Sequence, residues 1–274
     1  LNAAQQRALG TQADTATLAN ASVTVDGAAA SYPAGSVRAG IPVRAADDLT
    51  AWSLAEDGAI SAVGGAWDAQ QQTYTFDVIS GVTAIARFPF TDVPAGSWYY
   101  GAAAYAYNNG LFAGTTATTF APDMTMTRAM LVSVLWRLAG EPAPNGTNTF
   151  DDVPDGTWYT DAVTWAAENG VVAGIGNGRF DPDGSVTREQ TAVILFNYAQ
   201  SKGYDVSARA DLSAFPDAGS VSDWAQSALA WANASGLISG AVRGTQTILD
   251  PQGSASRAQV AMILMGYVEH VVNA

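Results

Sequence analysis

One segment of this chain occurs three times, and this repetition constrains the fold more than any other feature of the sequence. The copies start at Phe90, Phe150 and Phe215. An Asp, a Trp and an Arg recur at matching places: Asp92, Asp152 and Asp217; Trp98, Trp158 and Trp224; Arg128, Arg188 and Arg257. A repeat of this length buries its apolar face only against its neighbours. We therefore expect the three copies to fold together.

Each copy predicts a helix, a glycine-rich loop and a second helix. In the middle copy Thr157 is a suitable N-cap for a first helix over residues 158–169. Gly170 suits the left-handed residue that ends a helix. Ser97 and Ser222 take the capping position in the other copies. The first helix of each copy is therefore expected to begin next to its Trp.

The second helices begin with a hydroxyl N-cap at Thr127, Thr187 and Ser256. Gln190 and Gln259 complete a capping box, which Met130 breaks in the first copy. These helices are apolar on nearly every side, which is typical of buried helices. We expect the three to bury one another as a central bundle, with the Trp-bearing helices outside. The predicted fold class is mainly α, with a small N-terminal all-β domain.

Composition excludes several kinds of site. The chain of 274 residues has no Cys and one His, so disulfides and multi-histidine metal sites are excluded. A net charge of −13 argues against nucleic-acid binding, which needs a basic surface. No stretch reaches the roughly 18 apolar residues of a membrane span. Any export signal would lie upstream of Leu1.

The repeated motif Phe-x-Asp-Val-Pro…Trp-Tyr…Asn-Gly…Phe-x-Pro…Thr-Arg resembles the S-layer homology repeat of bacterial surface proteins. The resemblance covers residues 90 to about 270. It implies three repeats in a pseudo-threefold arrangement around a central three-helix bundle. It also implies grooves between neighbouring repeats that bind an anionic, often pyruvylated, secondary cell-wall polysaccharide. The expected function is non-covalent anchoring to the outside of a Gram-positive-type cell, through a peptidoglycan-linked glycan.

This chain departs from the family motif at one position in every copy. The family's Thr-Arg-Ala-Glu keeps its Arg at residues 128, 188 and 257, but its Glu is replaced by Met130, Gln190 and Gln259. The third copy also has Leu249 in place of the Phe before its Pro, and a small loop insertion. The middle copy is nearest to the family pattern.

The residue types suggest how an anionic sugar would bind. An Arg at the first position of a helix places its guanidinium beside unpaired N–H groups and the positive end of the helix dipole. Trp gives a sugar ring an apolar face, and glycines let backbone donors approach closely. The candidate polysaccharide-binding residues are Arg128, Arg188, Arg257, Trp98, Trp158, Trp224, Gly174 and Gly176.

Structural roles remain open for the same residues. Each Trp could belong to the core, and each Arg could be an ion-paired brace between repeats. Asp92, Asp152 and Asp217 are assigned to the bracing of their own turns. No metal site and no cofactor are predicted, because the "DPDG" at 181–184 lacks the remaining spacing of a calcium loop.

Residues before the repeats alternate apolar and polar side chains, which predicts short antiparallel strands in 21–27, 35–46, 49–56, 72–79 and 82–88. The expected domains are a tail or short helix (1–20), a β-rich spacer (21–89) and repeats at 90–148, 149–212 and 213–274. This division predicts that a fragment starting at Phe88 folds alone.

The chain is expected not to be an enzyme, since it has neither a Ser-His-Asp set nor a Gly-x-Ser-x-Gly elbow. Two alternatives to an anchor remain. One is a structural component of a surface lattice that self-associates. The other is the non-catalytic C-terminal part of a surface-anchored, glycan-acting enzyme.

Overall fold

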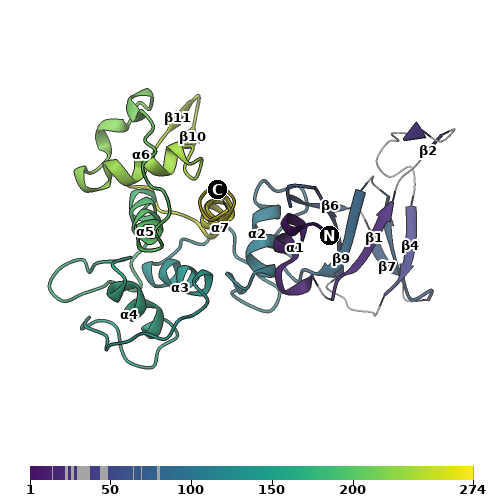
Figure 1. Ribbon diagram of the computed structural model, residues 1–274, viewed down its shortest axis with the longest axis horizontal. Helices are drawn as coiled ribbons and strands as arrows, with labels where there is room; N and C mark the ends of the chain where they lie inside the picture. The colour runs from purple at the N-terminus through teal and green to yellow at the C-terminus, as the bar shows by residue number, and fades with distance from the viewer. Residues whose placement is uncertain are drawn as a thin grey trace. The chain divides into compact units, whose positions relative to one another are not determined.

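The computed structural model describes residues 1–13, 15–21, 24–25, 28–29, 38–43, 49–63, 65–68, 70–78 and 81–273. The chain divides into two compact units, Leu1–Ala121 and Pro122–Ala274 (Figure 1). The boundary lies inside the first repeat, so its two predicted helices belong to different units.

The described residues of the first unit form two larger antiparallel sheets and a small ribbon. One has the strand order β1-β9-β5-β6, from Thr17–Ala21, Gly81–Arg87, Leu49–Leu54 and Ile60–Val63. The other has the order β4-β8-β7, from Arg38–Pro42, Thr73–Asp77 and Gly65–Asp68. A separate small ribbon pairs β2 (Thr24–Val25) with β3 (Ala28–Ala29). Strand β8 alternates in burial and supplies Tyr74 and Phe76 to a core with Ala51 of β5 and Ile85 of β9.

The sequence prediction of an N-terminal β region is confirmed, although some strands were missed. Strands β2, β4, β5, β8 and β9 fall in the predicted segments. Strands β1, β3, β6 and β7 were not predicted. Strands β1, β3 and β7 each carry at most one of the β-branched or aromatic residues that indicate a strand, and β6 is only four residues long. Parts of the predicted strands lie outside the described residues, namely positions 22–23, 26–27, 35–37, 44–46 and 79.

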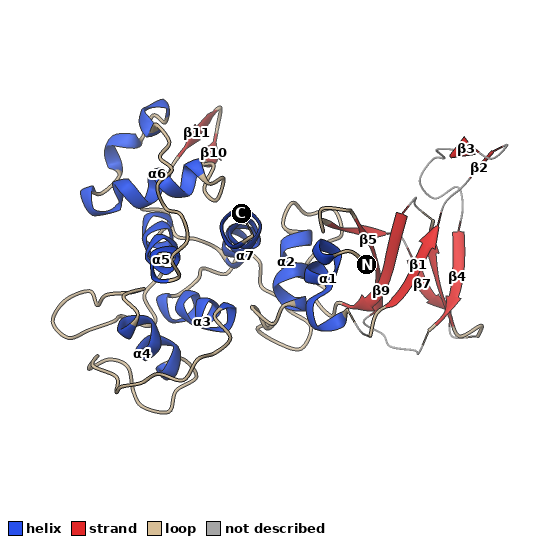
Figure 2. Ribbon diagram, viewed as in Figure 1, coloured by secondary structure: helices blue, strands red, loops and turns tan. Residues whose placement is uncertain are grey.

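The described part of the first unit also contains α1 (Ala3–Leu9), followed by the short η1 (Gly10–Gln12), and α2 (Tyr100–Asn108) (Figure 2). Helix α2 packs against β6 and α1. The side chain of Asn108 donates to the carbonyl oxygen of Ala8, at 3.0 Å, and the Thr11 hydroxyl donates to the Asn108 carbonyl. The first helix of the first repeat is therefore packed into the β-rich part of the chain.

The second unit contains helices α3 (Arg128–Leu138), α4 (Thr160–Glu168), α5 (Arg188–Ser201), α6 (Gln226–Ala234) and α7 (Arg257–Tyr267). It also contains the short helices η2 (Leu212–Ala214), η3 (Ala218–Ser220), η4 (Asp223–Ala225) and η5 (Val268–Val272), and the hairpin of β10 (Ala241–Arg243) and β11 (Gln246–Ile248). The predicted N-caps of α3, α5 and α7 are confirmed, and α5 and α7 have the predicted capping boxes.

The predicted caps of the first helices are wrong. Helix α4 begins at Thr160 after Tyr159, two residues later than expected, and no side chain caps it. The hydroxyl of Thr157 instead bonds the carbonyl of Pro154 and the hydroxyl of Thr160. Ser97 likewise donates to the carbonyl of Pro94, at 2.8 Å. Both hydroxyls are used by the turn that precedes the helix, so they are not available to its N–H groups.

Three equivalent segments meet in a closed ring of backbone hydrogen bonds. The N–H of Met126 donates to Ala255, Ala255 donates to Val186, and Val186 donates to Met126, at 2.9, 3.0 and 3.0 Å. These residues lie two positions before the first residues of helices α3, α7 and α5. The ring needs all three copies, because each copy supplies one donor and one acceptor.

The prediction of a mainly α protein built on a central three-helix bundle is wrong. Helix accounts for 36% of the structure and strand for 20%. The main helix contacts of the second unit are two pairs, α3 with α4 and α5 with α6. The second helix of one copy therefore packs against the first helix of the next. The apolar residues of α3, α5 and α7 that suggested a bundle are mostly buried.

Candidate functional site

Each repeated Asp holds the loop of its own copy. The Asp152 carboxylate accepts the N–H groups of Phe180 and Asp181, at 2.7 and 2.8 Å. Asp92 accepts those of Phe120 and Ala121, and Asp217 accepts those of Leu249 and Asp250. The second residue of each pair has a positive φ, of 58° at Ala121, 62° at Asp181 and 51° at Asp250. Non-glycine residues avoid this conformation, so the carboxylates stabilise strained turns.

Hydrogen bonds to Asp152 change its pKa. Desolvation raises the pKa of this carboxyl, but the N–H donors of Phe180 and Asp181 and the side chain of Arg179 outweigh it. The net effect lowers the pKa below its ordinary value. The ionised form of Asp152 is therefore the form that stabilises the turn.

The repeated arginines are buried, with 6–7% of each residue exposed. The Nε of Arg128 donates to the carbonyl oxygen of Phe180 and the Nε of Arg188 donates to that of Leu249, both at 2.8 Å. Each bond joins the start of one copy's second helix to the loop of the next copy. Desolvation lowers the pKa of both arginines, opposed at Arg128 by Asp181 and Asp152.

The backbone N–H groups at the helix starts already have partners. The N–H groups of Arg128 and Ala129 donate to Gly184 and Pro182, at 2.9 and 3.0 Å. The equivalent groups of α5 donate to Gly253 and Pro251, and those of α7 donate to Met124 and Pro122. The sequence predicted that such groups would be open to an anion. The structure assigns them to contacts between copies instead.

The three repeated tryptophans lie at the surface. Trp98, Trp158 and Trp224 are 63%, 59% and 58% exposed. Trp158 packs edge-on against Tyr159, with ring centroids 5.0 Å apart, and Trp98 does the same against Tyr99 at 5.2 Å. Trp is highly buried on average, so the exposure of three tryptophans at equivalent positions is unusual. The alternative that these tryptophans form the core does not fit this exposure.

One of these tryptophans lines a pocket of about 470 Å³ in the second unit, here called the repeat-2 groove. Its walls combine three copies: Arg128 of the first, the loop and helix α5 of the second, and Trp224 of the third. The lining residues are Arg128, Val171, Val172, Ala173, Gly174, Ile175, Gln190, Val193, Ile194, Asn197 and Trp224. Of the predicted site residues it therefore contains Arg128, Gly174 and Trp224.

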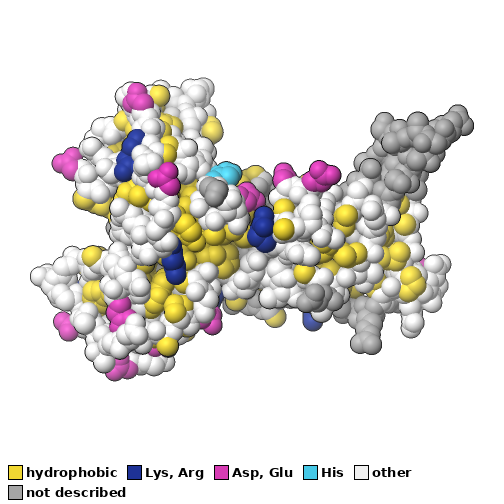
Figure 3. All heavy atoms as spheres, viewed as in Figure 1, with side chains coloured by type: hydrophobic (Ala, Val, Ile, Leu, Met, Phe, Trp, Pro, Cys, Tyr) yellow, Lys and Arg dark blue, Asp and Glu magenta, His cyan; other side chains and the backbone are white. Residues whose placement is uncertain are grey.

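The repeat-2 groove differs in charge from the protein as a whole. Asp and Glu outnumber Lys and Arg by 25 to 12, and Figure 3 shows acidic side chains scattered over the visible face. No residue that lines the groove is acidic. Arg128 uses two of its five N–H donors, for Phe180 and for Ala173 at 3.1 Å. Its Nη1 makes no hydrogen bond within the described part of the chain.

The predicted glycines have different roles. A Cβ on Gly174 would lie 2.5 Å from the carbonyl oxygen of Arg179, so only glycine fits this part of the groove wall. Gly176 has φ +103°, a Cβ placed on it would meet no atom within 4 Å, and it does not line the groove. Sequence reasoning missed Gln190 as a lining residue because it had been assigned to the capping box. It also missed Asn197, which lies two turns further along α5 and carries no motif signal.

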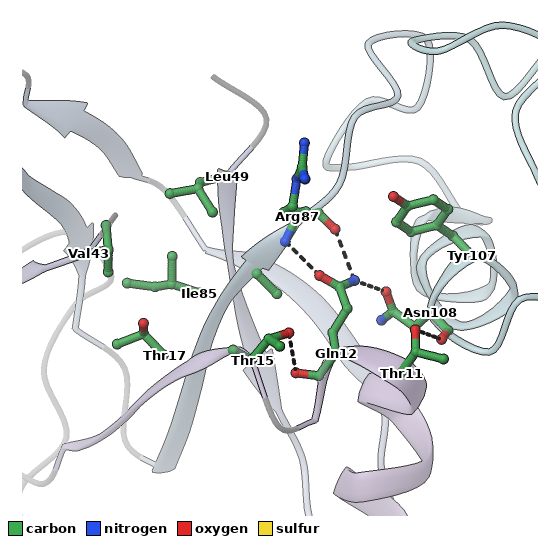
Figure 4. A pocket seen from close by; sticks show the side chains of 12 residues that line it. Thr11, Gln12, Thr15, Thr17, Val43, Leu49, Ile85, Arg87, Tyr107 and Asn108 are labelled. Atoms are coloured by element: carbon green, nitrogen blue, oxygen red, sulfur yellow. Dashed lines mark hydrogen bonds between the residues drawn. The ribbon is translucent and has the colours of Figure 1, made fainter. Parts of the chain in front are cut away.

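A second pocket, of about 780 Å³, lies in the first unit between strand β9 and helices η1 and α2. Gln12 lies between Arg87 and Asn108 on one side of it (Figure 4). The Gln12 amide accepts the N–H of Arg87 at 2.7 Å and donates to the Arg87 carbonyl at 3.0 Å and to the Asn108 side chain. These polar groups bond one another, which indicates a brace between β9 and α2.

The described residues contain no cluster of three or more His, Cys, Asp or Glu side chains that could hold a metal ion. None of the described helices is both long enough and apolar enough to cross a membrane.

Comparison with known proteins gives the same three segments. Residues 89–129, 149–192 and 214–261 match the S-layer homology domain. Similar proteins include an amylopullulanase of Thermoanaerobacterium thermosulfurigenes, 31% identical over 76% of this chain and 11% of that protein. A surface-layer 125 kDa protein of Lysinibacillus sphaericus is 32% identical over 59% of this chain and 13% of its own length. Exoglucanase XynX of Acetivibrio thermocellus is 33% identical over 57% of this chain and 14% of its own length.

These relatives are much longer than the present chain, which spans 11–14% of the three. Among solved structures, an undecaheme cytochrome from the S-layer of Carboxydothermus ferrireducens aligns with 54% of this chain at 21% identity. The TM-score of that alignment is 0.29, which is too low to indicate a shared fold.

Proposed function

Because residues 89–129, 149–192 and 214–261 are S-layer homology domains, we propose that they form a non-catalytic anchor whose repeat-2 groove binds an anionic cell-wall polysaccharide. The family match and the S-layer relatives indicate a cell-surface, cell-wall-associated protein. S-layer homology domains attach surface proteins to the cell wall. The proposal concerns the ligand and the groove that holds it.

The observation that carries the proposal is the pairing of Trp224 with Arg128 in one acid-free groove. Trp224 offers an exposed aromatic face to a sugar ring. The unused Nη1 of Arg128 offers a charged donor to a carboxylate, such as that of a pyruvyl group. Gln190 and Asn197 add amide groups that can bond sugar hydroxyls.

The charge of the chain supports a local rather than a long-range attraction. A net charge of −13 repels a polyanion at a distance. The groove, which is lined by one buried Arg and by no acidic residue, attracts an anion, but only over short distances. Weak binding at one groove becomes useful when several sites on a chain engage the same polymer, because each bound site raises the effective concentration at the next.

The test is binding of the full chain to purified wall sacculi, before and after removal of the secondary polymer. Trp224→Ala should lower the affinity by roughly tenfold, since one aromatic–ring contact contributes about 0.5–1.5 kcal/mol beyond its buried area. Val242→Ala is the control, because Val242 is 75% exposed in the same repeat and does not line the groove. Equal binding of stripped and intact sacculi would contradict the proposal.

A surface lattice is the alternative function, because several relatives are S-layer proteins. Lattice formation predicts that the purified chain associates with itself at rising concentration in the absence of wall polymer. Sedimentation measurements on the same sample distinguish this outcome from polymer binding. A parallel assay for released reducing sugar tests the proposal that these domains are not catalytic.

A further inference from the structure

Glu189, the second residue of helix α5, is a carboxylate buried between the second and third repeats, with 1% of the residue exposed. Its carboxylate accepts the backbone N–H of Ser222 at 3.1 Å and the Ser222 hydroxyl at 2.9 Å. It also accepts the side-chain amide of Gln252, at 2.7 Å. All three donors are neutral, and the start of the helix adds a favourable dipole. The carboxylate is therefore held in one position.

These bonds connect two walls of the repeat-2 groove. Glu189 directly precedes Gln190, which lines the groove from α5. Ser222 lies two residues before Trp224, which lines it from the third repeat. The short helix η4, which contains Trp224, also packs against α5. The Glu189–Ser222 contact thus ties the segment that carries Trp224 to the start of α5.

Only the middle repeat has this acid. Ala129 and Ala258 occupy the equivalent position in the other two copies, and both are 1% exposed. Alanine has no acceptor for a neighbouring serine. The third repeat supplies the partners of this acid, since Ser222 and Gln252 both donate hydrogen bonds to Glu189.

We infer that Glu189 is a positioning residue: it fixes Trp224 against helix α5 and so sets the width of the repeat-2 groove. This inference rests on the proposed function for its effect on binding, but not for its effect on Trp224. Replacement by Ala should leave the helix start intact, because the chain itself carries Ala at both equivalent positions.

The first experiment follows Trp224 without any ligand. The full chain, with its eight tryptophans, is labelled with 5-fluorotryptophan, and the Trp224 and Trp158 resonances are assigned from Trp224→Phe and Trp158→Phe. Glu189→Ala should shift or broaden the ¹⁹F resonance of Trp224 and leave that of Trp158 in place. Glu189→Gln, which keeps one acceptor oxygen for Ser222, should give an intermediate spectrum. An unchanged Trp224 resonance in Glu189→Ala overturns the inference, whatever happens to the melting temperature.

The second experiment measures affinity for the purified secondary wall polymer well below the melting temperature of each variant. Glu189→Ala should weaken binding about tenfold, the change that corresponds to about 1.4 kcal/mol. Adding Ser222→Ala to Glu189→Ala should have little further effect, since the two side chains act as one contact. Glu141→Ala is the control, because Glu141 is an exposed acid outside the groove.

The failures of the two proposals differ. The groove is rejected as the anchor site if the unaltered chain does not bind the polymer, or if Trp224→Ala binds it as tightly as the parent chain does. The fluorine spectra would still decide whether Glu189 positions Trp224. Normal affinity in Glu189→Ala together with reduced affinity in Trp224→Ala would overturn the positioning role in binding.

Discussion

The Nε of Arg128 lies 2.8 Å from the carbonyl oxygen of Phe180, so the first residue of one repeat's second helix is bonded to the loop of the next repeat. The ring of Phe180 lies under the same guanidinium, 4.8 Å from its Cζ. Arg188 makes the equivalent bond to Leu249. The arginine that the repeat pattern places at a helix start is therefore a link between repeats, and at Arg128 it also faces a groove.

Replacing Arg188 tests this linking role. Arg188→Ala should lower the free energy of unfolding of the second unit by about 1.5–3 kcal/mol, the range for a hydrogen bond made by a charged group. Arg188→Lys should recover only part of the loss, because a Lys cannot reproduce the Nε geometry. Urea unfolding followed by far-UV circular dichroism measures both variants. An unchanged unfolding midpoint for Arg188→Ala would show that the bond to Leu249 contributes nothing to stability.

Acid should weaken the turn that Asp152 holds. The pKa of Asp152 is lowered in the folded protein, so its ionised form contributes stability above the unfolded pKa of about 3.9. That contribution is lost as the pH falls through the lower, folded pKa. Asp152→Asn should therefore be less stable than the parent chain at pH 7, and the difference should shrink as the pH is lowered toward 3. A stability difference that is constant over this range would contradict the pKa assignment.

Gly10 tests the close packing of η1 against helix α2. A Cβ at Gly10 would lie 2.4 Å from the carbonyl oxygen of Asn108, and φ is +50°. Gly110 also has a positive φ, +66°, but no atom within 4 Å of such a Cβ. Gly110→Ala should cost about 1–2 kcal/mol for its backbone conformation alone. Gly10→Ala should destabilise the first unit by clearly more, as measured by thermal unfolding. Equal losses in the two variants would show that η1 moves away from Asn108 without penalty.

A fragment that starts at Phe88 should lose structure in its first part, contrary to the expectation from the sequence. Helix α2 packs on β6 and α1, and Tyr100 accepts a hydrogen bond from the buried indole of Trp52, at 2.9 Å. Residues 88–121 would lose these partners, whereas residues 122–274 keep their own compact unit. Hydrogen exchange of the fragment should show fast exchange in α2 and protection in α3, α5 and α7. Full protection of α2 would show that the fragment folds without the β-rich part.

Regular spacing was the most informative property of the sequence. It located the three Asp, Trp and Arg positions and the N-caps Thr127, Thr187 and Ser256. These features depend on residues close together in the chain, or on a motif repeated at a fixed interval. The groove could only be predicted in part, because its walls come from three copies and no single copy shows the whole set. Glu189 gave no signal as a functional residue, since one carboxylate in an acidic chain does not stand out without its partners.

The sequence by itself determined the repeat, the local turns and the starts of the second helices. Hydroxyl caps, glycines and prolines act on neighbouring backbone groups, so their effects do not depend on distant residues. Only the tertiary structure decided which apolar faces meet, and it placed α2 with the sheet and paired α3 with α4 and α5 with α6. The hydrophobic effect is non-directional, so a helix that is apolar on every side does not specify which element it packs against. Hydrogen bonds between distant segments, such as the ring of Met126, Val186 and Ala255, join the starts of α3, α5 and α7, and a single copy of the repeat cannot form them.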